Sequence, residues 1–281
     1  MKLGVYSICL PDYKREDAAR LVKAIGYTGI EWTVGYPDRV FESGEQWHVS
    51  LDELEQDAPR AKEVAQNHGL EIASLGTSSA TDDVEKIERL MKAAQVMGAP
   101  MLRIGSAGYD GSTHYNALAK KVIRDYETIQ KMAADNGVKA LIEIHGRTIC
   151  CSPSGTLRIL ENLDPQHVGC IYDPGNMVTE GLENLRMGIE MLGPYVAHVH
   201  AKNMCWRHDE TKGWYWDNAS LAGGIADFEL MFRALADYGY TGYINLEDFR
   251  GGYCVEPEGI TTQEKLTEGF EYMSGLLSAL A

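Results

Sequence analysis

The chain lacks any long hydrophobic run. A membrane-spanning helix needs about 18 consecutive apolar residues, and no stretch of the 281 residues approaches that length. The opening residues, MKLGVYSICLPDYKRED, pass directly from a strand-like run into charge, without the apolar core of a secretory signal peptide. We therefore expect a soluble cytoplasmic protein with no membrane partner.

Basic residues are also scarce. The 26 Lys and Arg face 41 Asp and Glu, which gives a formal net charge of −15. A protein that binds duplex nucleic acid usually needs a basic face, so we expect no nucleic-acid partner. An acidic surface suits a soluble enzyme that acts on small, mostly neutral molecules.

The six cysteines form no CxxC pair and no regular framework. Small disulfide-stabilised domains are much shorter and richer in cysteine, so we interpret these residues as reduced thiols. The cysteines are Cys9, Cys150, Cys151, Cys170, Cys205 and Cys254.

No Pro-, Gly- or Ser-rich linker divides the chain, and we expect a single domain over residues 1–281. Short apolar or β-branched runs alternate with stretches of helical spacing, such as residues 82–98 and 226–240. Parallel strands need crossover connections, so this alternation predicts a parallel sheet of the α/β class. Eight such units predict a single (β/α)₈ TIM barrel, which commonly has about 250 residues. The expected strands are 2–8, 29–34, 70–76, 100–106, 138–146, 168–176, 196–203 and 242–249.

One connection is unusually long and rich in aromatic residues. Residues 204–224 read MCWRHDETKGWYWDNASLAGG and follow the seventh expected strand. Loops of this length in a compact domain are usually functional or disordered. The three tryptophans argue against disorder, and we expect them either to cover a substrate or only to pack the loop.

The last four expected strands end in polar residues. Catalytic residues of TIM barrels lie at the carboxyl ends of the strands, and consecutive strands are neighbours. These ends should therefore converge on one arc of the rim. The residues are Glu143 and His145, Asp173 and Asn176, His198, His200 and Lys202, and Glu247 and Asp248.

Glu143, Asp173 and Glu247 would be costly to bury together without a positive charge. A divalent cation removes that cost, and His200 completes a mixed oxygen and nitrogen set suited to Mn²⁺, Mg²⁺, Co²⁺ or Zn²⁺. Each residue alone is more often structural, but four of them on four consecutive strands favour a metal site. His198 lies deeper in its strand, where we expect it to pack or to support the site.

This pattern resembles the xylose-isomerase-like TIM barrel superfamily of sugar phosphate isomerases and epimerases. The similarity runs along the chain through GVYS, GIEW, IEIHG, YDPGN, HVHAKN and GYINLED. The resemblance implies one divalent metal ion, with Mn²⁺ preferred, bound by Glu143, Asp173, His200 and Glu247. It also implies a small-molecule carbohydrate substrate and a homodimer or homotetramer. Many relatives carry a histidine where this chain has Asn176.

We therefore expect a metal-dependent isomerase or epimerase of a keto-sugar or related polyol ketone. It would act by proton abstraction next to a metal-bound carbonyl. Glu143 and Glu247 are the expected catalytic acid and base, on opposite faces of the substrate. The expected substrate-binding residues are His145, Asn176, Lys202, Trp206 and Arg207.

Other functions stay open. A lyase, either a dehydratase or a β-eliminating deglycosidase, shares the same first proton abstraction. An endonuclease IV-like enzyme is disfavoured, because that branch needs many more ligands for three metals and this chain has eight histidines and a strong negative charge. A non-catalytic sugar-binding protein also remains an alternative.

Overall fold

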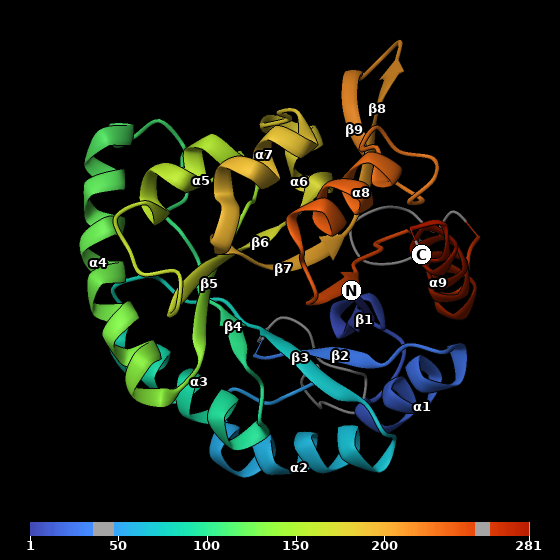
Figure 1. Cartoon of the computed structure of the whole chain (residues 1–281), viewed down its shortest axis with the longest axis horizontal. Coiled ribbons are helices and arrows are strands. Elements are labelled where there is room, and N and C mark those ends of the chain that lie inside the picture. Colours follow the sequence, from blue (N-terminus) through green and yellow to red (C-terminus); the bar gives the residue numbers. More distant parts are fainter. Residues whose placement is uncertain (36–47, 251–258, 281) are drawn as a thin grey trace.

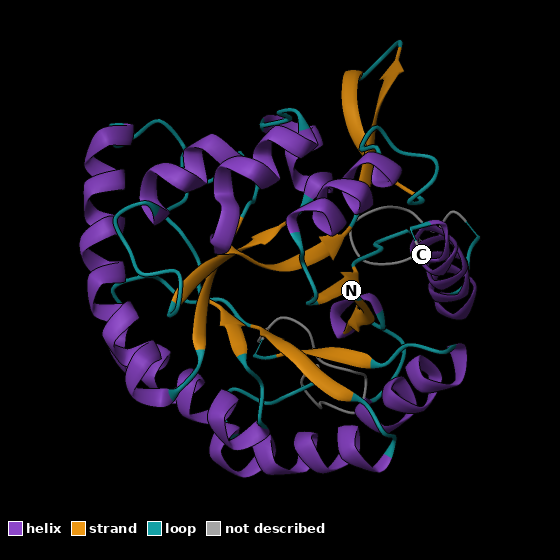
Figure 2. Ribbon diagram, viewed as in Figure 1, coloured by secondary structure: helices purple, strands orange, loops and turns teal. Residues whose placement is uncertain are grey.

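The computed structural model describes residues 1–35, 48–250 and 259–280. Eight parallel strands close into a barrel, with helices arranged around its outside (Figures 1 and 2). The order around the barrel is β1-β10-β7-β6-β5-β4-β3-β2, which confirms the predicted (β/α)₈ TIM barrel. The strands are β1 (Lys2–Tyr6), β2 (Gly29–Thr33), β3 (Glu71–Gly76), β4 (Met101–Arg103), β5 (Lys139–Glu143), β6 (Val168–Tyr172), β7 (Val196–Ala201) and β10 (Tyr243–Leu246).

The helices follow apolar residues that repeat at helical spacing. In α8, Phe228, Met231, Phe232 and Leu235 are buried against the barrel, and the side chain of Asp227 caps the first turn. The helices are α1 (Arg15–Ile25), α2 (Leu54–Asn67), α3 (Val84–Met97), α4 (Tyr115–Asn136), α5 (Pro153–Leu160), α6 (Pro174–Glu180), α7 (Leu185–Leu192), α8 (Phe228–Tyr238) and α9 (Thr262–Ala279), with 3₁₀ turns η1 (Ser7–Cys9) and η2 (Gly193–Tyr195). None of the helices in these ranges is both long and apolar enough to cross a membrane.

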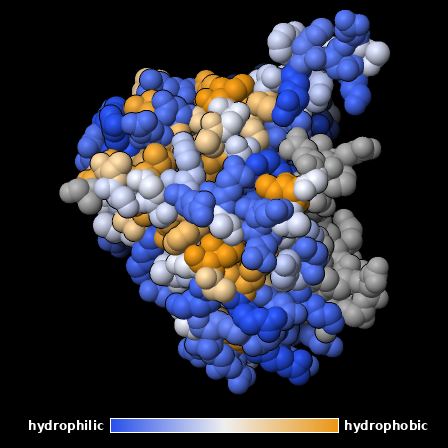
Figure 3. Space-filling view, turned by 90° about the vertical axis from the view of Figure 1, so that its right-hand side faces the viewer, coloured by the Kyte–Doolittle hydropathy of each residue, from blue (hydrophilic) through white to orange (hydrophobic). Residues whose placement is uncertain are grey.

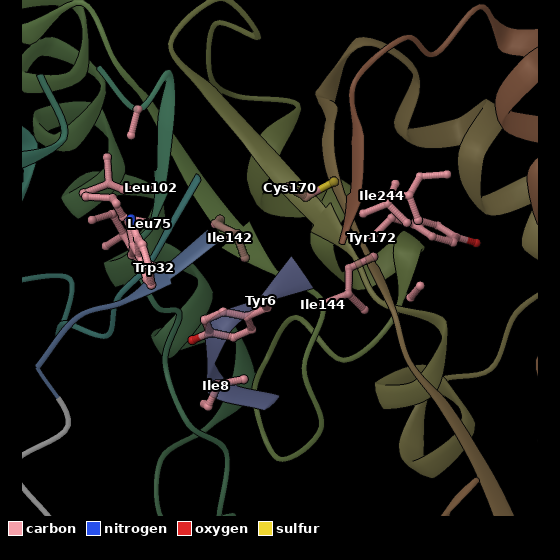
Figure 4. Packing of buried hydrophobic residues seen from close by; sticks show 14 of the residues in the cluster. Tyr6, Ile8, Trp32, Leu75, Leu102, Ile142, Ile144, Cys170, Tyr172 and Ile244 are labelled. Carbon is pink, nitrogen blue, oxygen red and sulfur yellow. The ribbon is translucent and has the colours of Figure 1, made fainter. Parts of the chain in front are cut away.

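The core is a continuous set of buried apolar side chains from the strands and the helices, part of which is drawn in Figure 4. The barrel interior also holds polar groups. Asn245 lies opposite Gly4 in the β1–β10 pair, and a Cβ atom on Gly4 would clash with Asn245 Oδ1. Glycine at position 4 therefore makes room for a buried amide inside the barrel.

The aromatic connection forms a β-hairpin, where we expected a long loop. Strands β8 (Asn203–Asp209) and β9 (Gly213–Ala219) pair in antiparallel register and project from the barrel (Figure 1). The pairing has a simple basis, since Trp206 lies opposite Trp216 and Gly213 takes a left-handed φ of +71° at the turn. Figure 3 shows the hairpin extending beyond a surface on which separate hydrophobic patches lie among hydrophilic residues.

The five cysteines within the described residues, Cys9, Cys150, Cys151, Cys170 and Cys205, all have free thiols. This agrees with the predicted absence of a disulfide framework. Cys254 lies outside the described residues.

Candidate metal centre and active site

The four predicted metal ligands come together at the carboxyl ends of neighbouring strands. Glu143 is the last residue of β5, and His200 is the fifth residue of β7. Asp173 directly follows β6 and caps α6 by accepting a hydrogen bond from the backbone of Asn176. Glu247 directly follows β10. All four side chains are buried, and one ligand atom from each lies within 4.8 Å of the others.

His200 faces carboxylates on both sides of its ring. Its Nδ1 lies 3.2 Å from Glu143 Oε1 and 3.5 Å from Glu247 Oε2. Its Nε2 lies 3.1 Å from Oε2 of Glu31, a buried residue of β2. The Nδ1 atom therefore points into the four-residue cluster, while Nε2 is held from inside the barrel.

Positive side chains determine the charge of these carboxylates. Burial disfavours ionisation of Glu143, but the neighbouring Arg103 and His200 outweigh it and hold the pKa of Glu143 well below its usual range. Burial likewise opposes the charged form of Glu247, yet Lys202 and His200 lower its pKa. Burial raises the pKa of Asp173 to about 8, because Lys202 only partly offsets it and both glutamates add repulsion.

This donor set fits a divalent metal ion. Three carboxylates and one imidazole nitrogen are close enough to share one ion, and these groups suit Mn²⁺, Mg²⁺, Co²⁺ or Zn²⁺. Burial and the two neighbouring glutamates disfavour the charged form of Asp173, and a cation in the cluster would favour it. With Nδ1 facing the metal, Nε2–H of His200 would donate to Glu31, a carboxylate–histidine arrangement common at metal sites.

A second buried cluster lies beside the first, inside the barrel. Glu31 Oε2 accepts from His198 Nε2 at 2.8 Å and from Asn245 Nδ2 at 2.9 Å, as well as from His200. His198 thus lies in the supporting position that we expected. Sequence reasoning missed Glu31, although a lone acidic residue in the apolar run GIEWTV was a usable signal.

A cavity of about 390 Å³ opens onto the four-residue cluster. Glu143 and Glu247 line it, together with three of the predicted substrate-binding residues, His145, Asn176 and Lys202. Trp216, one of the three tryptophans expected either to cover a substrate or only to pack the loop, also lines it. Arg103 and Arg147 line it as well, and sequence reasoning had not assigned these two to the site.

Lys202 and Asn176 form a buried polar pair on the cavity wall. Lys202 Nζ lies 3.2 Å from Glu247 Oε2 and 3.1 Å from Asn176 Oδ1. Asn176 Nδ2 donates to Asp173 Oδ2 at 2.5 Å. Lys202 is therefore buried, with its ammonium group held beside the cluster.

The other two predicted substrate-binding residues lie elsewhere on the hairpin. The indole N–H of Trp206 donates to the carbonyl of Val178 at 3.0 Å, and Arg207 pairs with Asp217 at 2.9 Å. Neither is among the residues that line the cavity, where the side chain of Trp216 contributes instead. Their part in substrate binding stays a prediction.

Comparisons with known proteins bear on the fold and the family of the chain. No match was found among curated protein sequences. Among solved structures, 3-keto-D-glucoside 4-epimerase from E. coli is 17% identical, with a TM-score of 0.72 over 98% of this chain and 99% of that one. A probable 3-DHS dehydratase from Bacillus anthracis is 16% identical, with a TM-score of 0.74 over 98% and 99%. A xylose isomerase-like TIM barrel protein from Mycobacterium smegmatis, solved with magnesium, is 20% identical, with a TM-score of 0.70 over 100% and 98%.

These likenesses extend along the whole barrel, but at such low identity they speak for the fold alone. The sequence itself gives the family. The model of the xylose isomerase-like TIM barrel family matches residues 19–274, and this chain belongs to that family.

Proposed function

We propose that the protein is a metal-dependent epimerase or isomerase of a keto-sugar or related polyol ketone. One observation carries the proposal: Glu143 and Glu247 belong to the metal cluster and also line the cavity. Two carboxylates that face one cavity can act as an acid and a base on a molecule bound between them. The similarity to an epimerase and to a magnesium-containing barrel of the same fold supports this assignment.

Each residue has a distinct part in this mechanism. The metal ion, preferably Mn²⁺, would be held by Glu143, Asp173, His200 and Glu247. When bound, the ion supplies Lewis-acid polarisation of a substrate carbonyl and neutralises developing negative charge. Glu143 or Glu247 removes the proton on the carbon next to the carbonyl, and the other returns a proton on the opposite face.

The neighbouring polar residues orient the substrate. The Lys202 ammonium group lies between Glu247 and Asn176, where it can donate to a substrate oxygen on the cavity side. His145 is exposed at the cavity wall and can bind a hydroxyl group. Because Arg103 pairs with Glu143 at 2.5 Å, it keeps that carboxylate charged and ready to accept a proton.

Deuterium exchange tests the proposal. The full-length protein is loaded with Mn²⁺ and incubated in D₂O with a panel of keto-sugars, and mass spectrometry follows the incorporation of deuterium next to the carbonyl. We expect metal-dependent exchange, with the carbon skeleton retained, for at least one member of the panel. Exchange that is unaffected by removing the metal, or equal in parent and Glu143→Gln protein, would contradict the mechanism.

A lyase acting on a keto-sugar or keto-glycoside is the second candidate. The specific observation in its favour is Trp216, which places an aromatic ring on the cavity wall where a bulky leaving group would pack. The similarity to a dehydratase of the same fold is in keeping with it. The same incubation separates the two functions, since a lyase releases water or an alcohol and an epimerase releases neither.

A further inference from the structure

Arg147 has an unusual backbone conformation at the edge of the cavity. Its φ is +60°, and no other non-glycine residue in the described ranges has a positive φ. A side chain with a Cβ atom is disfavoured in this left-handed region, and such residues cluster at functional sites when the surroundings hold them there.

The surroundings fix the Arg147 backbone from two directions. Its N–H donates to the carboxylate of Glu180, at the end of α6, at 2.5 Å. Its carbonyl accepts from the N–H of Tyr109, in the segment before α4, at 2.8 Å. The same turn is closed by Thr148, whose hydroxyl donates to the carbonyl of His145 at 2.7 Å. The strained conformation is therefore imposed by both neighbouring segments.

The guanidinium group of Arg147 is available for a ligand. The residue is exposed and lines the same cavity as Glu143 and Glu247. The other strong cations of that wall are already paired, Arg103 with Glu143 and Lys202 with Glu247. Within the part of the chain that the structure describes, no carboxylate lies within ion-pair distance of the Arg147 side chain, and Glu180 is engaged by the backbone N–H.

We propose that Arg147 binds an anionic group of the substrate, a phosphate or a carboxylate, at the end remote from the reacting carbonyl. This inference rests on the proposed function and narrows its substrate to an acidic keto-sugar. Guanidinium groups bind both anions through paired hydrogen bonds. A net charge of −15 repels such a substrate. An arginine on the cavity wall, with its backbone held and no carboxylate partner among the described residues, would provide the local attraction.

The first experiment measures anion binding without turnover. Inorganic phosphate is titrated by calorimetry, at constant ionic strength, into the full-length parent protein and three variants: Arg147→Gly, Arg147→Gln and Arg60→Gln. Arg60, an exposed residue of α2, is the matched control, because Arg60→Gln changes the net charge as Arg147→Gln does. We expect phosphate affinity to fall about 10- to 100-fold in both Arg147 variants and to be unchanged in the Arg60 variant.

Arg147→Gly also separates binding from a structural role. Glycine adopts a positive φ without strain, so this variant should melt at the same temperature as the parent or at a higher one. A clear fall in melting temperature with unchanged phosphate affinity would overturn the proposal. Equal phosphate affinity in all four proteins, or no phosphate binding by the parent, would overturn it as well.

The second experiment identifies the anion. Deuterium exchange is compared for D-fructose, D-fructose 6-phosphate and a keto-sugar acid, in the parent and in Arg147→Gln. Faster exchange of the phosphorylated or the carboxylated ketose, lost on substitution, would assign the group. If neutral ketoses exchange equally well in both proteins and no acidic ketose is preferred, the proposed function stands and this inference fails. If phosphate binding depends on Arg147 but no keto-sugar exchanges, the anion site stands and the proposed function fails.

Discussion

Nε2 of His200 lies 3.1 Å from Oε2 of Glu31, although β2 and β7 are separated in the barrel by β1 and β10. This contact crosses the barrel interior and fixes the rotation of the imidazole ring. It leaves Nδ1 directed at Glu143 and Glu247. A residue of the second strand thus orients a candidate metal ligand on the seventh.

We expect Glu31→Gln to weaken metal binding while leaving the four proposed ligands in place. An amide at this position keeps the size of the side chain but loses the negative charge that holds His198 and His200. Loss of such a supporting carboxylate typically lowers metal affinity about 10- to 100-fold. Competition with a chelating indicator dye measures the affinity, with Glu71→Gln on the protein surface as the control. Equal affinities in parent and Glu31→Gln would show that Glu31 has no such role.

Glu143→Gln and Glu247→Gln should each abolish proton exchange in a protein that still folds. Glutamine can offer an oxygen atom to the metal but cannot accept the proton. The rate of exchange should fall at least about 10²- to 10⁴-fold, and weakened metal binding would add to the loss. Circular dichroism checks the fold, and Glu190→Gln on the surface of α7 is the control. Near-parental rates in either variant would remove that glutamate from the mechanism.

Trp216→Ala should weaken substrate binding without loss of metal. Trp216 lines the cavity, whereas Trp214 lies further along the hairpin and is 70% exposed. We expect KM to rise by about fivefold for Trp216→Ala, because the lost aromatic contact is worth on the order of 1 kcal/mol. Trp214→Ala provides the comparison and should behave like the parent. Similar KM values for the two variants would exclude a specific contact from Trp216.

The buried His48 should make folding sensitive to acid. Its Nε2 donates to the carbonyl of Tyr13 at 2.8 Å, and burial lowers the pKa of His48 from 6.5 to about 4. The unfolded chain therefore takes up a proton at a higher pH than the folded one. The resulting stability is present above pH 6.5 and is lost as the pH falls from 6.5 towards 4.

Chemical denaturation of the parent and His48→Gln at pH 7 and pH 5 measures this effect. The glutamine amide can still donate to Tyr13 but does not titrate. The free energy of unfolding of the parent should fall by about 2 kcal/mol more than that of the variant between these two pH values. A constant difference between parent and variant would show that the pKa of His48 is not lowered in the folded protein.

The sequence predicted the fold well because each barrel strand corresponds to its own short run of apolar or β-branched residues. All eight expected runs contain an observed barrel strand, and 168–176 fails as a continuous strand only because Asp173 caps α6. The 204–224 segment was harder to interpret. Its strand pairing depends on cross-strand contacts such as that between Trp206 and Trp216, which a composition rich in aromatic residues does not specify.

Only part of the candidate site could be predicted from the sequence, because some of its residues are recognised by their contacts and not by their place in a strand. Glu143, Asp173, His200 and Glu247 lie at or directly after the carboxyl ends of recognisable strands, so their convergence follows from barrel topology alone. Glu31 and Arg103 reach the site from strands outside that arc, and only the three-dimensional packing reveals their partners. Arg147 stands out through its backbone angle, a property that no sequence pattern displayed.

The barrel closes by pairing β1 with β10, and Glu247 directly follows β10. When β10 pairs with β1 and closes the barrel, it also brings Glu247, the last of the four proposed ligands, into place. A nascent chain that has not yet placed β10 beside β1 presents an open sheet and lacks one of the four proposed ligands. An ion held by all four residues would therefore also oppose opening of the barrel between β1 and β10, and would couple metal affinity to the stability of the closed sheet.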